Sequence, residues 1–193
     1  KKRKLQKFLC ISTDEVYGSI QYDDQSFKET DRLRPSNPYS ACKAGADLLC
    51  LSYFNTYGLD IVITRSSNNY GPWQHPEKFI PRMITLAIQN KPLQVYGDGN
   101  NIRDWLYVED NCTGVKAVME GGKPGEIYNL GAGNELDNNQ VAKNISDRFN
   151  VPIKYIIDRP GHDYRYSVNF RKIYDQLGWK PNMNFHDGLN KTT

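Results

Sequence analysis

Tyr39 and Lys43 are a pair of residues whose types and spacing suggest chemistry. Residues four apart on a helix project from the same face, so the phenol and the ammonium group are expected to lie close together. An ordinary tyrosine has a pKa of about 10, and a neighbouring positive charge lowers that pKa by stabilising the phenolate. A Tyr-x-x-x-Lys pair can therefore remove a proton from a sugar or alcohol hydroxyl. The same spacing also occurs by chance on many helices, so the pair alone is a weak indication.

A second candidate group, Ser12-Thr13-Asp14-Glu15, directly follows a short apolar run. It is expected at the carboxyl end of a buried strand, where ligand crevices open in parallel sheets. Two adjacent carboxyl groups with different environments can act as an acid and a base, one protonated and the other ionised. The plainer interpretation is an acidic pair in a turn or at a helix N-terminus, which explains most Asp-Glu dipeptides.

The elements that would position these residues alternate along the chain. Buried strands are expected at 8–11 and 61–63. A helix is expected between them, capped by Asn37 and beginning at Pro38. It ends at about Tyr57, before Gly58. Strand, helix and strand in this order form a parallel unit.

Further elements continue the alternation. A polar loop is expected at 66–77, and the later elements are helices at 79–88, at about 109–121 and at 140–149, with strands at 93–96, 127–130 and 153–157. The pattern predicts an α/β fold built on a parallel sheet.

Composition and charge exclude several classes of protein. The chain has 193 residues, is 38% hydrophobic, and carries 25 Lys and Arg against 22 Asp and Glu, for a net charge of +3. This near balance argues against a nucleic-acid binder, and we interpret the basic run at residues 1–7 as a solvated helix end. No apolar run approaches the roughly 18 residues that span a bilayer, and no signal peptide is evident, so a cytoplasmic protein is expected.

The cysteines and histidines are few and irregularly spaced. No C-x-x-C pair is present, and the residues concerned are Cys10, Cys42, Cys50 and Cys112 together with His75, His162 and His186. Neither a disulfide framework nor a bound metal is expected.

Six segments, taken together, carry a resemblance to a known family. The chain resembles the dTDP-glucose 4,6-dehydratases, of the extended short-chain dehydrogenase/reductases, in the segments Ser12-Thr13-Asp14-Glu15-Val16-Tyr17-Gly18, Tyr39-Ser40-Ala41-Cys42-Lys43, Ser67-Asn68-Asn69-Tyr70-Gly71-Pro72, Pro76-Glu77-Lys78-Phe79-Ile80-Pro81, Ile102-Arg103-Asp104-Trp105-Leu106-Tyr107 and Asp158-Arg159-Pro160-Gly161-His162-Asp163. The motifs occur in the family's order over nearly the whole chain. The Tyr-x-x-x-Lys pair marks the superfamily, whereas the Thr-Asp-Glu triplet marks the nucleotide-sugar 4,6-dehydratases.

The resemblance implies a dehydration in which NAD+ is reduced and reoxidised within each turnover. Tyr39 would take the proton of the sugar C4 hydroxyl while hydride leaves C4, and Lys43 would hold the phenolate and the cofactor ribose. The resulting 4-keto group acidifies C5, from which Glu15 would remove a proton. Asp14 would protonate the departing C6 hydroxyl, and Thr13 would hydrogen-bond the C4 oxygen. Hydride then returns to C6, giving a 4-keto-6-deoxy sugar.

The resemblance also implies a set of binding residues. It places Asn68 on the sugar nucleotide, Asn69 together with Tyr39 and Lys43 on the cofactor, and around the diphosphate and nucleoside Lys78, Tyr96, Arg103, Asn129, Arg159 and His162. Arginine offers a planar fork to phosphate and lysine a point charge. From the residues alone, purely structural roles stay open as well: an ion pair of Arg103 with Asp104, a core position for Tyr96 and a loop hydrogen bond for His162. Glu77 is interpreted as a helix N-terminal residue.

The chain departs from the family in lacking the glycine-rich dinucleotide fingerprint, because its first strand leads directly into Ser12-Thr13-Asp14. The chain therefore resembles only the C-terminal portion of the family. The expected organisation is a Rossmann-like, doubly wound parallel sheet without its first strands at residues 1–75, and mainly a smaller nucleotide-sugar-binding domain at 76–193, with some segments returning to the sheet. Cys42 and Gln94 are smaller departures, which remove no catalytic group.

Three alternatives stay open at this point. UDP-glucose 4,6-dehydratases share the acidic pair, so the nucleobase is not readable from these residues. The isolated chain is alternatively a silent sugar-nucleotide-binding piece, because most NAD contacts lie in the part that it lacks. A nucleic-acid binder with a basic N-terminus has little support. For the full-length protein the family implies a homodimer formed through the helix that carries Tyr39 and Lys43.

Overall fold

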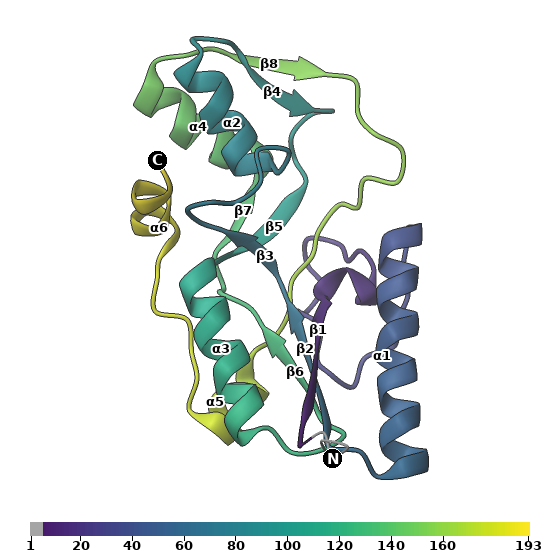
Figure 1. The fold of residues 1–193 in the computed structure, drawn as a ribbon. Helices are drawn as coiled ribbons and strands as arrows, with labels where there is room; N and C mark the ends of the chain where they lie inside the picture. The colour runs from purple at the N-terminus through teal and green to yellow at the C-terminus, as the bar shows by residue number, and fades with distance from the viewer. Residues whose placement is uncertain (1–5) are drawn as a thin grey trace, which may run out of the picture.

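The computed structural model describes residues 6–193. Most of the basic run at residues 1–7 therefore lies outside the described residues. Figure 1 shows two groups of elements along the long axis of the molecule, one around β1, β2 and β6 and the other around β4 and β8.

The first group is a parallel sheet with helices on both faces. The sheet has the order β1-β2-β6, formed by β1 (Phe8–Thr13), β2 (Ile61–Ser66) and β6 (Ile127–Leu130). Helix α1 (Pro38–Tyr57) lies on one side of these strands, and α3 (Val108–Gly121) and α5 (Arg171–Leu177) lie on the other (Figure 1). Because Thr13 pairs with Ser66 and Ser66 with Leu130, the strands end at the same edge.

Helix α1 begins and ends where the sequence predicts. The Asn37 side chain accepts a hydrogen bond from the backbone N–H of Ser40, and the Ser40 hydroxyl oxygen accepts one from the N–H of Asn37, which completes a capping box. Pro38 occupies the first turn, where its missing N–H costs nothing. Gly58 ends the helix with φ 65°, a left-handed conformation that suits glycine.

The second group consists of shorter elements. Strand β5 (Ile102–Tyr107) pairs in parallel with β3 (Asn68–Tyr70) and antiparallel with β7 (Glu135–Asp137), and β4 (Leu93–Tyr96) pairs in parallel with β8 (Ile153–Ile156). Helices α2 (Phe79–Ile88) and α4 (Asn138–Phe149) pack against each other and against β4. Their apolar faces form a core that includes Ile80, Met83, Leu93, Val141 and Ile145. A single 3-10 turn, η1 (Asp14–Tyr17), and the C-terminal α6 (Phe185–Thr192) complete the described elements.

The expected α/β architecture with a parallel sheet is confirmed, and several details differ. The segment 66–77, expected as a loop, contains β3. The strands expected at 8–11 and 61–63 continue to Thr13 and Ser66, because buried polar residues follow their apolar runs. Strand β5 escapes prediction because its sequence contains two charged residues, Arg103 and Asp104, both buried.

In the described part of the chain, no helix combines the length and the apolar character needed to cross a membrane.

Candidate functional site

A polar cleft opens beyond the carboxyl ends of β1 and β2, where Glu15 and Asn68 follow these strands. It consists of two cavities of about 400 Å³ each, which share the lining residues Glu15, Asn68, Lys78, Arg103 and Arg159. One cavity continues to Tyr96, Asn138 and His162, and the other to Asn37, Tyr39 and Tyr166. Of the residues predicted from the sequence, the structure thus brings together Glu15, Tyr39, Asn68, Lys78, Tyr96, Arg103, Arg159 and His162.

The acidic pair occupies the 3-10 turn that directly follows β1. Thr13 caps this turn: its hydroxyl oxygen accepts from the backbone N–H of Glu15 at 3.3 Å, and the hydroxyl donates to Asp14 Oδ1 at 3.3 Å. Glu15 lines the cleft, whereas Asp14 is buried behind it with 3% of its surface exposed. The tight turn therefore gives two adjacent carboxyl groups different environments.

Asp14 is held in its protonated form. Burial, followed by the negative charges of Glu15 and Asp104, raises the pKa of Asp14 to about 8. Its Oδ2 atom is buried and has no hydrogen-bond partner among the described residues. At neutral pH Asp14 is thus a neutral carboxylic acid beside the carboxyl group of Glu15, which is the arrangement that an acid–base pair needs.

Tyr39 and Lys43 lie one turn apart on α1, but the expected effect of the lysine on the tyrosine is corrected by the structure. Lys43 Nζ donates to the carbonyl oxygen of Ile11 in β1, at 2.6 Å. Burial and the nearby charges of Glu15 and Asp14 raise the pKa of Tyr39, and the cation that opposes this rise is Lys78. The physical reason is that the lysine amine is directed at a strand carbonyl, so the phenol responds to the groups that line the cleft.

Asn68 and Asn69 stand side by side at the start of β3 with unused hydrogen-bonding capacity. Their Oδ1 atoms are buried without a partner among residues 6–193, as are the hydroxyls of Ser12 and Ser67 at the nearby strand ends. Asn69 is anchored by its Nδ2, which donates to the Ser67 carbonyl oxygen at 3.0 Å. Since buried polar atoms are normally paired, these oxygens fit a ligand that carries hydrogen-bond donors.

Arg103 projects towards the cleft from β5. Its guanidinium donates to the carbonyl oxygens of Ile102, Asp163 and Tyr164 and lies 4.5 Å from the ring centroid of Tyr166. The ion pair with Asp104 that the sequence left open is not formed, because the Asp104 carboxylate accepts from the backbone N–H groups of Ala132 and Asn134 instead. Arg103 is therefore available to the cleft as a cation held by backbone carbonyls.

The remaining cleft residues come from loops around the second group of elements. Lys78 precedes α2 and pairs with Glu77 at 3.1 Å, and Tyr96 ends β4. Arg159 and His162 belong to the segment after β8, where His162 Nδ1 lies 2.8 Å from Asp158 Oδ1. Burial lowers the pKa of His162 against the opposing effect of Asp158, so the ring is mainly neutral at pH 7. Lys78, Arg103 and Arg159 thus give the cleft a positive wall suited to phosphate groups.

Asn129 does not line either cavity of the cleft, so its predicted role in substrate binding gains no support from this geometry. It is fully buried in β6, its Oδ1 accepts from the Tyr17 hydroxyl at 2.8 Å, and its Nδ2 donates to the Phe27 carbonyl oxygen at 3.0 Å. Through these bonds the Asn129 side chain joins the sheet to η1 and to the loop after it.

Asn138, which sequence reasoning missed, occupies the cleft instead. It is the first residue of α4 and lines the cavity beside Tyr96 and Arg103. Its place depends on the pairing of β7 with β5, which brings the start of α4 to the cleft. A polar residue directly after the Asp137 cap was the available signal, but neither strand was predicted.

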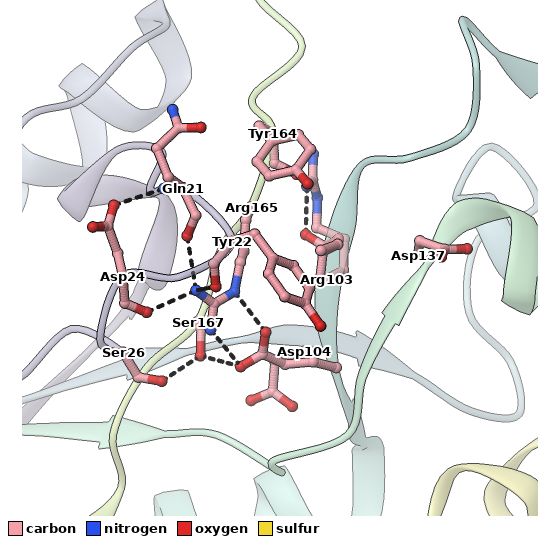
Figure 2. A network of polar contacts seen from close by, with 12 residues as sticks. Gln21, Tyr22, Asp24, Ser26, Arg103, Asp104, Asp137, Tyr164, Arg165 and Ser167 are labelled. Carbon is pink, nitrogen blue, oxygen red and sulfur yellow. Dashed lines mark hydrogen bonds and ion pairs between the residues drawn. The ribbon is translucent and has the colours of Figure 1, made fainter.

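A partly buried network supports this region, and Figure 2 shows Arg165 at its centre. Arg165 Nη1 donates to the carbonyl oxygens of Gln21, Tyr22 and Asp24, each at 2.9 Å, and its Nε donates to Glu135 at 2.7 Å. The same carboxylate accepts from the Ser167 hydroxyl at 2.6 Å. The network thereby ties the loop after the acidic pair to β7.

A larger cavity of about 640 Å³ lies elsewhere, against Phe170, Tyr174 and Pro181, and includes none of the predicted residues. Two cations line it, Arg171 and Lys180, and Arg171 is already paired with Asp175 at 2.8 Å. The polar cleft, where the carboxyl groups and cations converge, is therefore the candidate active site.

Comparisons with known proteins show which proteins this chain is similar to. The family model for GDP-mannose 4,6 dehydratase matches residues 1–192. A dTDP-glucose 4,6-dehydratase of Actinoplanes sp. is 47% identical over 189 residues, covering 96% of this chain and 58% of that protein. The low-salt glycan biosynthesis protein Agl12 of Haloferax volcanii is 50% identical over 188 residues, covering 96% of this chain and 60% of the relative.

A solved structure shows the same fold. The dTDP-glucose 4,6-dehydratase of Bacillus anthracis, solved in complex with NAD, superposes with a TM-score of 0.93 at 44% sequence identity and covers 96% of this chain and 60% of that one. The chain thus spans somewhat under two thirds of the length of the relatives that it matches.

Proposed function

Because the chain belongs to the family described as GDP-mannose 4,6 dehydratase, we propose that it forms the acid–base and sugar-nucleotide-binding part of a nucleotide-sugar 4,6-dehydratase acting on dTDP-glucose. The observation that carries the proposal is the pairing of Asp14, protonated and buried, with Glu15 at the cleft wall. An elimination that removes a C5 proton and expels a C6 hydroxyl needs one base and one acid on neighbouring carbons. The choice of dTDP-glucose is supported by the relatives that bear that enzyme's name.

The proposal keeps the roles that the family resemblance implies for these side chains. Tyr39, at the start of α1, takes the proton of the C4 hydroxyl, and Lys43 holds the cofactor ribose. Glu15 removes the C5 proton, since its carboxyl group lines the cleft. Asp14 gives its proton to the departing C6 hydroxyl, and Thr13 hydrogen-bonds the C4 oxygen.

NAD is the proposed cofactor, supported by the solved relative that contains it. When bound, it supplies the hydride acceptor for C4, the hydride donor for C6 and, when oxidised, a positive charge that favours a phenolate. The residues of this chain that would hold it are Tyr39, Lys43 and Asn69. The unpaired oxygens of Ser67 and Asn69 fit the donors of a carboxamide or ribose group.

The cleft cations are assigned to the nucleotide. Lys78, Arg103 and Arg159 converge on one wall and are proposed to bind the diphosphate. Asn68 is proposed to contact the sugar nucleotide. Tyr96, His162 and Asn138, at the far end of the same cavity, are proposed to face the nucleoside.

The test is turnover by the full-length protein with dTDP-glucose, UDP-glucose and GDP-mannose in separate reactions. We expect a 4-keto-6-deoxy product, with dTDP-glucose used best by at least tenfold in kcat/KM. Equal turnover of dTDP-glucose and UDP-glucose would refute the assignment of the nucleobase. No keto product from any of the three would refute the dehydratase itself.

A calorimetric titration of residues 1–193 alone separates the contributions of this chain. We expect dTDP to bind through the cleft cations. We expect NAD+ to bind weakly, because this chain offers the cofactor only Tyr39, Lys43 and Asn69 and lacks the glycine-rich dinucleotide fingerprint. Submicromolar NAD+ binding would contradict that division.

For the full-length protein we also propose a homodimer formed through α1. This helix exposes Leu48, Leu49 and Tyr53 among others, which is an apolar face on a helix otherwise packed on the sheet. Light scattering of the full-length protein and of a Leu49→Glu variant tests this, with the variant expected to be monomeric. The proposed location is the cytoplasm, supported by four free thiols in a chain whose cysteines are all described.

A further inference from the structure

Asn37 makes two hydrogen bonds with its side chain, and they link two parts of the candidate site. Its Oδ1 accepts from the N–H of Ser40 at 2.9 Å, which caps α1. Its Nδ2 donates to Glu15 Oε2 at 3.4 Å, across 22 positions of the chain. Asn37 also lines the cavity that contains Tyr39. One amide therefore joins the helix of Tyr39 to the carboxyl group of Glu15.

The orientation of this amide follows from the cap. The backbone N–H of Ser40 is a donor, so the amide atom that faces it must be the oxygen. The NH2 group is then left facing Glu15. The helix N-terminus thus fixes a donor towards the carboxylate.

The residue type matters because other good caps lack this donor. Serine, threonine and aspartate cap helices about as well as asparagine. A serine is too short to reach Glu15 while it caps, and an aspartate would place a second negative charge there. Asparagine can both cap the helix and donate to a carboxylate.

Glu15 has charged and titratable neighbours on every side. Asp14 precedes it on η1, Tyr39 faces it from α1, Glu77 and Lys78 from the segment before α2, and Arg103 from β5. The segment 158–166 adds Arg159, His162 and Tyr166, with Asp163 bonded to the Tyr166 hydroxyl. Several cations therefore compete for the Glu15 carboxylate, and one of them, Arg103, sits near its partner acid Asp14.

We propose that Asn37 is a positioning residue for Glu15, holding the carboxylate against the start of α1 so that it faces the sugar C5 while Tyr39 faces C4. The inference rests on the proposed dehydration. A Glu15 carboxylate fixed in this way stays at the start of α1 and does not pair with Lys78, Arg103 or Arg159, the cations proposed to bind the diphosphate. The base and the tyrosine are thus aligned by one side chain.

The experiment uses Asn37→Ser and Asn37→Asp in the full-length protein. Both variants retain a cap, so their melting temperatures are expected to stay close to that of the unmodified protein. Asn37→Ser is expected to slow solvent exchange at C5 about tenfold, because a charge-assisted hydrogen bond is lost. Asn37→Asp is expected to shift the acidic limb of the pH–rate profile about one unit upward, because a second carboxylate disfavours the ionised form of Glu15.

A matched control is Asn184, which caps α6 in the same way and donates to the Asp187 carboxylate at 2.6 Å. Asn184→Ser and Asn184→Asp are expected to leave C5 exchange and the pH–rate profile unchanged. Asn37 variants with normal exchange and a normal profile would overturn the inference. The inference would also be overturned if the Asn37 variants lost activity only in proportion to their loss of melting temperature, with an unshifted pH–rate profile.

A second readout separates this inference from the proposed function. The carboxyl carbon of Glu15, assigned in NMR spectra with Glu15→Gln, is titrated in the unmodified protein and in both Asn37 variants. A changed titration supports the contact even when the protein dehydrates none of the sugars, and an unchanged titration refutes it. Failure of dehydration by the unmodified protein refutes the proposed function alone.

Discussion

Arg103 and Asp104 are neighbours in β5 and serve opposite faces of the strand. The Arg103 guanidinium lines the cleft, whereas the Asp104 carboxylate accepts hydrogen bonds from the N–H groups of Ala132 and Asn134 at 2.8 and 2.9 Å. Side chains alternate across a strand, so two adjacent charged residues are divided between binding and structure. Substituting each residue in turn separates these roles.

Arg103→Lys is expected to raise the KM for the nucleotide sugar about tenfold or more in the full-length protein, with little effect on kcat. Lysine keeps the charge but loses the planar fork that matches phosphate oxygens. Steady-state kinetics measures the effect. A change in kcat with KM intact would contradict a binding role.

Asp104→Ala is expected to lower the free energy of unfolding by about 2–4 kcal/mol, because two backbone N–H groups lose their buried acceptor. Urea unfolding of residues 1–193 measures it. Asp175→Ala, which removes an exposed carboxylate paired with Arg171, is the control and is expected to cost under about 1 kcal/mol. Equal losses in the two variants would contradict the structural role of Asp104.

Asp14→Asn tests the buried acid through the pH dependence of stability. The pKa of Asp14 is about 8 in the folded chain and about 3.8 as its ordinary value. Between these values the unfolded chain loses the proton and the folded chain keeps it, so folding is progressively disfavoured as the pH rises. Below pH 4 and above pH 8 this contribution is constant.

The variant lacks this titration. As the pH rises from 4 to 8, its free energy of unfolding is therefore expected to increase by up to a few kcal/mol relative to that of the unmodified chain. Denaturant unfolding at several pH values measures the difference. Asp23→Asn, at an exposed position, is the control and is expected to give parallel curves. Parallel curves for Asp14→Asn would show that the acid is ionised in the folded state.

Much of this arrangement is readable from the sequence because it depends on local signals. The Asn37 cap, Pro38 and Gly58 bound α1 by short-range chemistry, and the apolar runs of β1 and β2 identify buried strands. The cleft residues near such elements, including Glu15 and Tyr39, were predicted through motifs that the chain keeps intact.

The remainder depends on long-range pairing, which one sequence does not reveal. Strand β5 is recognisable only once β3 and β7 flank it, because its buried charges are satisfied by partners such as Asn134 and Asp163. Long-range pairing also explains why Asn138 lines the cleft where the sequence predicted Asn129. Each asparagine lies in or near a predicted element, and only the strand pairing decides which one reaches the cleft. The direction of the Lys43 amine likewise depends on where β1 ends relative to α1.

Glu15→Gln in the full-length protein is expected to abolish solvent-derived exchange at C5 while leaving the initial oxidation at C4 in place. An amide cannot remove the C5 proton, whereas Tyr39, which acts on C4, is still present. Incubation in deuterated water followed by mass spectrometry of the sugar measures the exchange. Rapid exchange in this variant would assign the base to another residue.

The pKa of Tyr39 is raised by burial, by Glu15 and by Asp14 and is lowered by Lys78. Removing a negative neighbour and removing a positive one must therefore shift the tyrosine in opposite directions. Glu15→Gln is expected to move the pH dependence of C4 oxidation to lower pH, and Lys78→Met to higher pH, each by a fraction of a unit to about one unit. Single-turnover formation of reduced NAD as a function of pH measures both. Shifts in the same direction would show that the oxidation step reports a group other than Tyr39, because these two charges act on the phenol with opposite signs.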